Sequence, residues 1–319
     1  MAAKDGDGWA LCERGHRHWG LHGASGLLAV HFDAGGTPHV LMQKRSWWSH
    51  HGGTWGLPGG ALDSHEDAVT GALREALEEA ALSGESLRVL GVHIDDHGGW
   101  AFQTVIAEAD ALLPAVPAND ESTDMRWLPA DEVGGETLHP GFAETWPVIR
   151  PSLPPSVVVL DAANIVGARA EHGWWRDRAG AARRLLADVE RLVEHGLRPP
   201  EGFPAPAMWF PRVVMVLEGA AKGVRSGGTA DTADTAGVAD TAGVADTAGV
   251  ADTAGVVGVV EAPASGDDAI VDTVRENREV RPWQRVLVVT ADRELRRRVA
   301  ELGAAAVGPG WLLGQLRRV

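Results

Sequence analysis

The fold of the first half of this 319-residue chain is decided by two stretches, G-A-L-D-S-H-E at residues 60–66 and R-E-A-L-E-E at residues 74–79. Alanines and leucines recur in and between them every three to four residues, which predicts an amphipathic helix over residues 65–80. Asp63 or Ser64 is the predicted N-cap, and an acid three residues further on would complete a capping box. Short predicted strands surround this helix, so the first half is expected to be an α+β domain.

The predicted helix carries Glu75, Glu78 and Glu79 at positions i, i+3 and i+4, which places three carboxylates on one helix face. Like charges so close together destabilise an isolated helix. A hard divalent cation such as Mg²⁺ or Mn²⁺ removes this cost, because it binds oxygen ligands and leaves coordination positions for water and phosphate. The alternative is a charged helix face that is simply solvated.

The whole string resembles the box of the Nudix hydrolase family. In that pattern a glycine is followed after five residues by a glutamate, and after seven more by Arg-Glu, an apolar residue, any residue and Glu-Glu. The pattern ends with any residue, a glycine and an apolar residue. The matching positions are Gly60, Glu66, Arg74, Glu75, Ala76, Glu78, Glu79 and Leu82. Ala81 departs from the pattern, since the family has glycine there for a left-handed helix exit, in which alanine costs roughly 1 kcal/mol. Displacement of the turn to Ser83 and Gly84 is the alternative.

The resemblance implies a Nudix fold, in which a mixed sheet carries the helix. It also implies hydrolysis of a nucleoside diphosphate linked to another group, as in a nucleoside triphosphate, a modified nucleotide or a capped RNA end. Glu75 and Glu79 would be the principal ligands of Mg²⁺ or Mn²⁺, and Glu78 a further ligand or a water holder. Arg74 would orient these glutamates by ion pairing, and Gly60 would allow the loop backbone to approach closely.

In this family a catalytic base or an extra ligand often comes from outside the box. Glu121 is the candidate here, because it precedes a predicted strand at 125–128 as in similar proteins. Glu108 and Asp96 are the alternatives, and a solvated loop acid is the competing interpretation of Glu121.

Aromatic residues near the box offer faces for a nucleobase, although tryptophan in a small domain more often belongs to the core or its rim. The candidates are Trp47, Trp48, Trp55 and Trp100. The neighbouring S-H-H sequence at residues 49–51 lacks the spacing and the Cys or Asp partners of a metal site. We therefore interpret it as polar loop sequence near the pocket.

Composition narrows the class of protein. Residues 1–150 hold 9 Lys/Arg against 22 Asp/Glu, so this half repels a polyanionic substrate unless divalent cations bridge the charges. A single cysteine excludes a disulfide framework and fits a reducing compartment. No apolar run is long enough to span a membrane, and no signal segment opens the sequence. A cytoplasmic protein without membrane association is expected, whereas its oligomeric state cannot be predicted.

The chain is long enough for two domains. A proline-rich linker at residues 151–156 separates residues 1–150 from residues 157–319, where predicted strands alternate with helices as in a parallel α/β sheet of Rossmann-like type. The sequence A-D-T-A-G-V is repeated four times within residues 226–256. Each unit offers one valine for burial, so we predict a disordered low-complexity insertion there.

Acidic residues follow several predicted strands of the second half, namely Asp161, Glu218, Asp267, Asp268 and Asp292. Residues just past the carboxyl ends of parallel strands converge at one edge of a sheet, which is where a metal-dependent phosphodiesterase centre would form. Helix N-capping is the alternative role for the last three.

Three strings strengthen the active-site interpretation: D-A-A-N-I-V at 161–166, S-G-D-D-A-I-V at 265–271 and V-T-A-D-R-E-L at 289–295. They resemble the NYN domain, a branch of the PIN-like ribonuclease folds. The resemblance implies that Asp161, Asp267 or Asp268, and Asp292 bind metal ions, with Asn164 supporting the first aspartate. Arginines on the helix after Asp292 are candidate RNA contacts, or else an ordinary solvated basic face.

Together these patterns predict a Mg²⁺- or Mn²⁺-dependent pyrophosphohydrolase acting on a nucleotide, with a second, ribonuclease-type site and RNA as a candidate partner. Two alternatives stay open. In one, RNA cleavage by the second half is the main activity and the first half senses nucleotides. In the other, both halves are binding modules.

Overall fold

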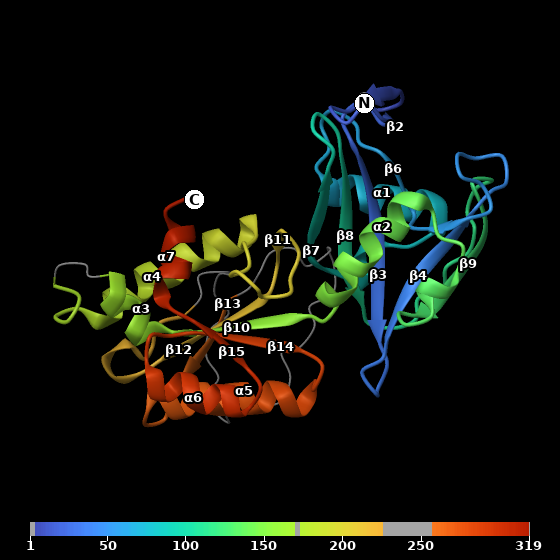
Figure 1. Ribbon diagram of the computed structural model, residues 1–319. Coiled ribbons are helices and arrows are strands. Elements are labelled where there is room, and N and C mark those ends of the chain that lie inside the picture. Colours follow the sequence, from blue (N-terminus) through green and yellow to red (C-terminus); the bar gives the residue numbers. More distant parts are fainter. Residues whose placement is uncertain (1–3, 170–172, 226–256, 319) are drawn as a thin grey trace, which may run out of the picture.

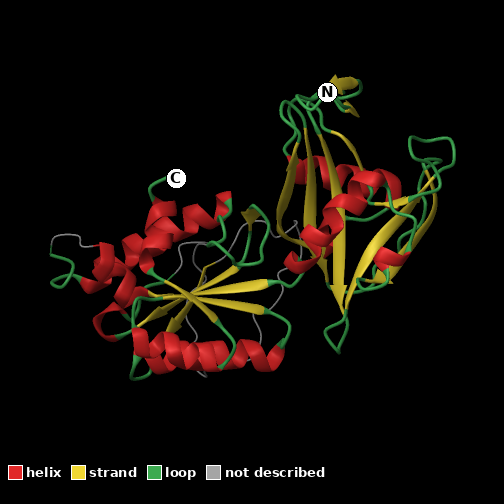
Figure 2. Cartoon of the chain, viewed as in Figure 1, coloured by secondary structure: helices red, strands yellow, loops and turns green. Residues whose placement is uncertain are grey.

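The computed structural model describes residues 4–169, 173–225 and 257–318, whose strands form two main sheets (Figures 1 and 2). The expected disordered insertion at about 226–256 lies outside these residues. A mixed sheet is built mainly from the first half of the chain, and a parallel sheet from the second. Among the described residues no helix combines the length and the hydropathy that crossing a bilayer requires.

The mixed sheet has the order β11-β7-β8-β3-β4-β5, with β6 paired to β3 and β9 paired to β4. Strands β3 and β8 run parallel, whereas β7 with β8 and β3 with β4 are antiparallel. The strands are β3 (Ala24–Phe32), β4 (Pro38–Arg45), β5 (Trp55–Gly56), β6 (Gly59–Ala61), β7 (Leu87–Asp96), β8 (Ala101–Ala109), β9 (Ser122–Pro129) and β11 (Met208–Trp209). A separate two-stranded sheet pairs β1 (Trp9–Leu11) with β2 (Arg17–Trp19).

Both faces of the mixed sheet are covered, which explains why β3 reads as a nearly continuous apolar run. Leu27 and Ala29 face the core under helix α1 (Ala68–Ala80), whereas Leu28 and Val30 belong to the core on the opposite side with helix α2 (Pro140–Ile149). Alternate residues of one strand therefore serve two different hydrophobic layers. The short 3-10 helices η1 (Gly84–Ser86) and η2 (Val133–Gly135) lie in the connections.

Two details of helix α1 differ from the sequence prediction. Its N-cap is Asp67, which accepts a hydrogen bond from the Thr70 N–H at 2.8 Å, so neither Asp63 nor Ser64 caps the helix. Asp63 instead accepts the backbone N–H groups of the N-terminal segment. At the other end Ala81 itself is left-handed, with φ 54° and ψ 26°, so the exit turn is not displaced.

The parallel sheet has the order β13-β12-β10-β14-β15, and all its neighbouring strands are parallel, as predicted. Helices cover both faces, giving a three-layer α/β/α arrangement (Figure 2). Its strands are β10 (Ser156–Asp161), β12 (Arg212–Leu217), β13 (Val257–Glu261), β14 (Arg285–Val289) and β15 (Ala305–Val307). The helices are α3 (Ala162–Arg169), α4 (Arg178–His195) and α7 (Pro309–Leu316) on one face, α5 (Gly266–Val280) and α6 (Arg293–Glu301) on the other, and the short η4 (Gly219–Ala221).

The connection between the sheets is less extended than the prolines suggest. A 3-10 helix, η3 (Arg150–Ser152), continues directly from α2, Leu153 is buried, and β10 already begins at Ser156. The two halves also touch. Strand β11 joins the edge of the mixed sheet through β7, although it comes from the second half of the chain.

Side chains add to this contact. Arg281 donates to the buried carboxylate of Glu108 at 2.8 Å, and Trp283 stacks on Phe32 at a ring-centroid distance of 5.9 Å. Glu108, an alternative candidate for the extra catalytic group, is thus engaged between the halves by Arg281 and also by Arg88.

Candidate active site

Helix α1 lies close to the sheet because the residues on its buried side are small. Ala72, Ala76 and Ala80 are fully buried against the core that β3 contributes to. The same close approach carries Glu79 into the protein, where it is only 2% exposed. A carboxylate at this depth requires polar partners, since burying an unpaired charge is costly.

Arg74 organises the carboxylates around it. Its Nε and Nη2 atoms donate to both oxygens of Glu66 at 2.7 and 2.9 Å, and its Nη1 donates to Glu75 Oε1 at 2.7 Å. Nη1 also lies 3.5 Å from Glu78 Oε2. The guanidinium lowers the pKa of Glu66, which in turn accepts the N–H of Asp63. Arg74 therefore connects the helix glutamates to the loop that precedes the helix.

The loop backbone approaches the glutamates closely. The Gly59 N–H donates to Glu79 Oε2 at 2.8 Å. A Cβ added at Gly60 would lie 2.4 Å from Glu75 Oε1, so only glycine fits there without moving that carboxylate. Gln43 of β4 is a further neighbour of Glu79. In the amide orientation that satisfies both neighbours, it donates to Glu79 Oε2 at 3.1 Å and accepts from Ser122 Oγ at 2.9 Å.

Glu121 joins this group from the start of β9. Ser46, just after β4, donates its N–H to the Glu121 carbonyl at 2.8 Å and so holds the acidic loop beside the helix. Burial, together with the charges of Glu75 and Glu121, raises the pKa of Glu79 to about 8. Burial also raises the pKa of Glu75, to which the nearby charges of Glu78 and Glu121 add.

Glu75, Glu78, Glu79 and Glu121 therefore form an anionic cluster. Arg74 neutralises only part of its charge. All the donors are oxygens, some are exposed and some buried, which is the ligand chemistry that suits Mg²⁺ or Mn²⁺. The residues present fit such an ion. Of the two alternatives to Glu121, Glu108 is engaged by two arginines, and Asp96 accepts from the Gly98 N–H at the far end of β7.

The tryptophan candidates separate into two pairs. Trp55 and Trp100 are buried, the first beneath the Lys44 and Arg126 cations. Trp47 is 84% exposed and Trp48 is 56% exposed, in the loop that follows β4. Only this second pair presents ring faces to a ligand.

A histidine group next to that loop includes two of the residues 49–51. His139, at the N-terminus of α2, brings a third imidazole to His50 and His51, and their ring nitrogens lie within 4.8 Å of one another. Burial lowers the pKa of His139 to about 4, assisted by the charges of Arg45, His51 and His50. No sequence spacing signals this group, because His139 comes from a distant segment.

The acids of the parallel sheet meet as predicted. A crevice of about 280 Å³ at the carboxyl ends of β10 and β12 is lined by Asp161, Asn164, Glu218, Asp267 and Asp292, among others. It lies where the strand order reverses between β10 and β14, the usual ligand position in such sheets. Asp268 does not line it and pairs with Arg298 at 2.6 Å, so the structure brings Asp267 to the crevice rather than its neighbour.

Local hydrogen bonds position the crevice acids. Asp161 accepts from the Asn164 N–H at 3.0 Å and from Thr290 Oγ1 at 2.8 Å, and Asn164 Oδ1 accepts from the Ala291 N–H. Asp292 is also the N-cap of α6, so the capping interpretation holds for it as well. Burial raises the pKa of Asp161, and the charges of Asp267 and Glu218 raise it further.

Two of the four arginines on the helix after Asp292 are paired with acids. Arg297 forms ion pairs with Glu294 and Glu301, and Arg298 pairs with Asp268. The solvated basic face is therefore the better description of these two arginines.

Comparison with known proteins identifies the family of the first half of the chain. The family model described as the NUDIX domain matches residues 24–150. A Mycobacterium tuberculosis protein named "Putative 8-oxo-dGTP diphosphatase 3" is 48% identical over 152 residues, which cover 46% of this chain and 70% of that protein. A Bifidobacterium longum "Nucleoside triphosphate pyrophosphatase/Nudix hydrolase fusion protein" is 44% identical over 146 residues, which cover 44% of this chain and 30% of that protein.

Among solved structures, a Nudix hydrolase from M. smegmatis, RenU, is 46% identical, with a TM-score of 0.44. The match covers 46% of this chain and 93% of that structure. The tuberculosis protein is matched over more than two thirds of its length at 48% identity, so the family assignment does not depend on the helix motif alone. The chain belongs to the Nudix hydrolase family and is a hydrolase of pyrophosphate bonds.

Proposed function

We propose that residues 1–150 form a domain that hydrolyses an oxidised purine nucleoside triphosphate of the 8-oxo-dGTP type, with Mg²⁺ or Mn²⁺ as cofactor. The observation that carries the chemistry is the cluster of Glu75, Glu78, Glu79 and Glu121 around the Arg74-organised helix face. The substrate class rests on the 48% identity to the tuberculosis protein of that name.

Glu75 and Glu79 would hold the cation, with Glu78 as a further ligand. Bound there, the ion would neutralise the carboxylates and the phosphates and polarise the phosphoryl oxygens, which would make the phosphorus more electrophilic. The protein's own part is positional. The hydrogen bond from Arg74 to Glu75 and that from the Gly59 N–H to Glu79 hold the two carboxylates in place before substrate binds.

Glu121 is the proposed proton acceptor. It is exposed, unlike Glu79, and lies beside that residue on a loop fixed by Ser46, so its carboxylate is accessible to the attacking water. Trp47 and Trp48, which follow Ser46 in the chain, offer exposed ring faces for the purine base. The hydrogen bond from the Ser46 N–H to the Glu121 carbonyl would thereby connect the loop that binds the base to the segment that carries the proton acceptor.

A nucleotide panel tests this proposal. Wild type should release diphosphate from 8-oxo-dGTP faster than from dGTP with Mg²⁺, and Glu79→Gln should lose activity by at least about a hundredfold. Glu85→Gln is the matched control, because Glu85 is exposed just beyond the same helix. Equal rates on both nucleotides would reject the substrate class, and an active Glu79→Gln would reject the role of the cluster.

We also propose that residues 157–319 form a NYN/PIN-like domain with a metal-dependent ribonuclease site. The observation that favours it is the convergence of Asp161, Glu218, Asp267 and Asp292 in one crevice at the reversal of strand order. Asp161 and Asp292, with Asp267, would be the metal ligands. In the rival form of this proposal RNA cleavage is the main activity and the first half senses nucleotides.

Degradation of a labelled RNA by the full chain distinguishes these forms. Asp161→Asn should abolish RNA cleavage and leave nucleotide hydrolysis unchanged, whereas Asp268→Asn, outside the crevice, should change neither. RNA cleavage that persists in Asp161→Asn would exclude the crevice as the site. Nucleotide hydrolysis absent from wild type, with RNA cleavage present, would favour the rival form.

A further inference from the structure

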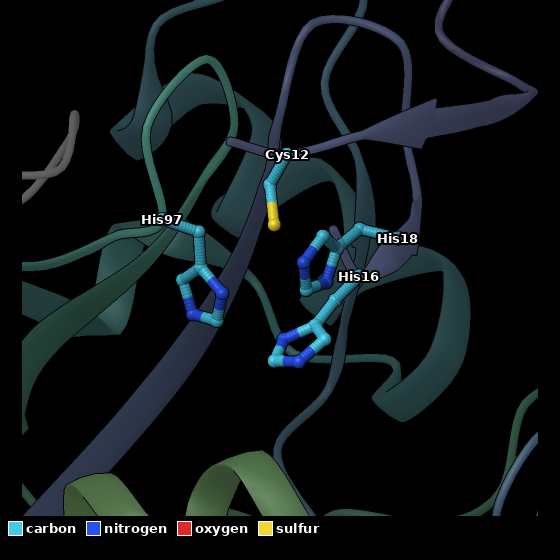
Figure 3. Close-up of side chains that lie close together, drawn as sticks. All are labelled: Cys12, His16, His18 and His97. Carbon is cyan, nitrogen blue, oxygen red and sulfur yellow. The ribbon is translucent and has the colours of Figure 1, made fainter. Parts of the chain in front are cut away.

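Four side chains outside the carboxylate cluster, Cys12, His16, His18 and His97, form another group that could hold a metal ion (Figure 3). Cys12, His16 and His18 come from the β1–β2 hairpin, and His97 comes from the turn between β7 and β8. Figure 3 shows the thiol and the three imidazoles turned toward one another. One potential ligand atom from each of the four lies within 4.8 Å of the others.

This spacing is close to that of a metal centre. Four ligands around a tetrahedral Zn²⁺ ion lie roughly 3.3–3.8 Å apart, given Zn–N and Zn–S bonds of about 2.0–2.3 Å. Side-chain movements of about an ångström would therefore complete the geometry. One thiolate and three imidazoles form a ligand set that favours zinc, whereas Mg²⁺ prefers oxygen.

Two ring nitrogens of this group lack partners. His18 Nε2 and His97 Nδ1 are buried without a hydrogen bond. The other ring nitrogen of His97, Nε2, lies 3.0 Å from Asp95 Oδ2. A carboxylate that accepts from one nitrogen leaves the lone pair of the other directed inward, and this arrangement is typical of histidines that bind zinc. A metal would resolve two buried polar atoms that the protein itself does not satisfy.

The surrounding residues hold the ligands in place. Trp100 stacks on His18 at 4.0 Å between ring centroids and meets His97 edge-on at 5.6 Å. The Cys12 N–H donates to the His16 carbonyl, and Gly15, with φ +81°, closes this turn in a conformation that favours glycine. These contacts fix the hairpin ligands and His97 around one point.

The hairpin is bonded to the turn between β7 and β8 by the Glu13 N–H, which donates to the Gly98 carbonyl, and by Arg14, which donates to the Asp96 carbonyl, but its apolar core is small. Its hydrophobic cluster contains three buried residues, Cys12, Ala24 and Trp100. Trp9 and Trp19, which pair across β1 and β2, are each 46% exposed. A two-stranded hairpin with so small a core is marginal by itself, and small structural units of this kind are commonly stabilised by a metal.

We infer that Cys12, His16, His18 and His97 bind one structural Zn²⁺ ion, which fastens the β1–β2 hairpin to the turn between β7 and β8. The site is separate from the carboxylate cluster and differs from it in ligand chemistry. The hairpin is linked to the loop before helix α1, because the segment preceding the hairpin forms hydrogen bonds with Asp63 and Ser64. Binding of zinc would therefore also affect this loop, although only indirectly.

Cobalt substitution in the full chain tests the inference directly. Cys12 is the only cysteine of the chain, so a thiolate-to-cobalt charge-transfer band can arise only from this site. Protein stripped of metal and titrated with Co²⁺ should show that band, with tetrahedral d–d bands, saturating at one equivalent and disappearing when Zn²⁺ is added. Absence of the charge-transfer band in folded wild-type protein would overturn the inference without recourse to any variant.

Variants extend the test. Protein purified without chelators should contain one zinc ion per chain, and Cys12→Ser or His97→Ala should reduce this content severalfold or more. His50→Ala, from the other histidine group, is the control that should retain it. Circular dichroism and Mg²⁺-dependent hydrolysis report whether each variant folds. A folded Cys12→Ser that keeps its zinc, or a wild type without zinc that also fails to take up Co²⁺, would contradict the site.

Discussion

Replacing Glu79 by glutamine should change how the stability of the metal-free protein depends on pH. The carboxylate is buried against the Gly59 N–H and beside Glu75 and Glu121, and its pKa is raised from 4.5 to about 8. A group whose pKa is higher in the folded state holds its proton more tightly there. The contribution of Glu79 to the free energy of unfolding is therefore fully present below about pH 4.5 and is lost as the pH rises through about 8.

The size of this effect follows from linkage. Each pH unit between the unfolded and folded pKa values costs about 1.4 kcal/mol, so complete ionisation of Glu79 costs up to roughly 5 kcal/mol. Part of this cost belongs to repulsion from Glu75 and Glu121, which a cation would also relieve. Glu79→Gln cannot ionise, so its metal-free stability should fall much less between these pH values.

Thermal unfolding in chelator, followed by calorimetry so that separate transitions are resolved, provides the measurement. The transition that includes helix α1 should shift to lower temperature as the pH rises from 5 to 8 in wild type. Mg²⁺ should reverse this shift, and the glutamine variant should show little of either effect. An equal pH dependence in wild type and variant would refute the argument that Glu79 is the titrating group.

Three further predictions follow from single contacts. Gly60→Ala places a methyl group 2.4 Å from the Glu75 carboxylate that Arg74 holds, so hydrolysis should fall about ten- to a hundredfold while the fold is kept. Ala81→Gly relieves a left-handed alanine and should stabilise the first half by about 0.5–1 kcal/mol in urea unfolding, after allowance for the more flexible unfolded chain. Arg281→Ala removes one of the two arginines that pair with buried Glu108, and hydrogen exchange in β8 should become faster.

Each of these three predictions can be contradicted by a single measurement, and a glycine in open space provides a control for Gly60→Ala. Gly134→Ala meets no atom within 4 Å and should leave hydrolysis unchanged. Full activity of Gly60→Ala would show that the Glu75 carboxylate moves without consequence. A less stable Ala81→Gly would mean that the exit strain is already relieved elsewhere. Unchanged exchange in Arg281→Ala would show that Arg88 alone satisfies the glutamate.

The sequence determined the parts of this protein that depend on neighbours along the chain. The spacing of Glu75, Glu78 and Glu79 fixes their common helix face, because helical geometry relates residues three and four apart whatever surrounds them. Alternating strands and helices likewise predicted the parallel sheet. Even here the predicted N-cap was wrong, because Asp67 caps the helix and Asp63 accepts a hydrogen bond from the N-terminal segment.

The tertiary structure decided what depends on segments distant in the chain. It placed Glu121 beside Glu79, selected Asp267 over Asp268, and added β11 to a sheet formed by the other half. It also gathered Cys12 with three histidines, and His139 with two, groups that sequence spacing alone does not reveal. Such groupings arise from packing and strand pairing between remote elements, and no local periodicity encodes them.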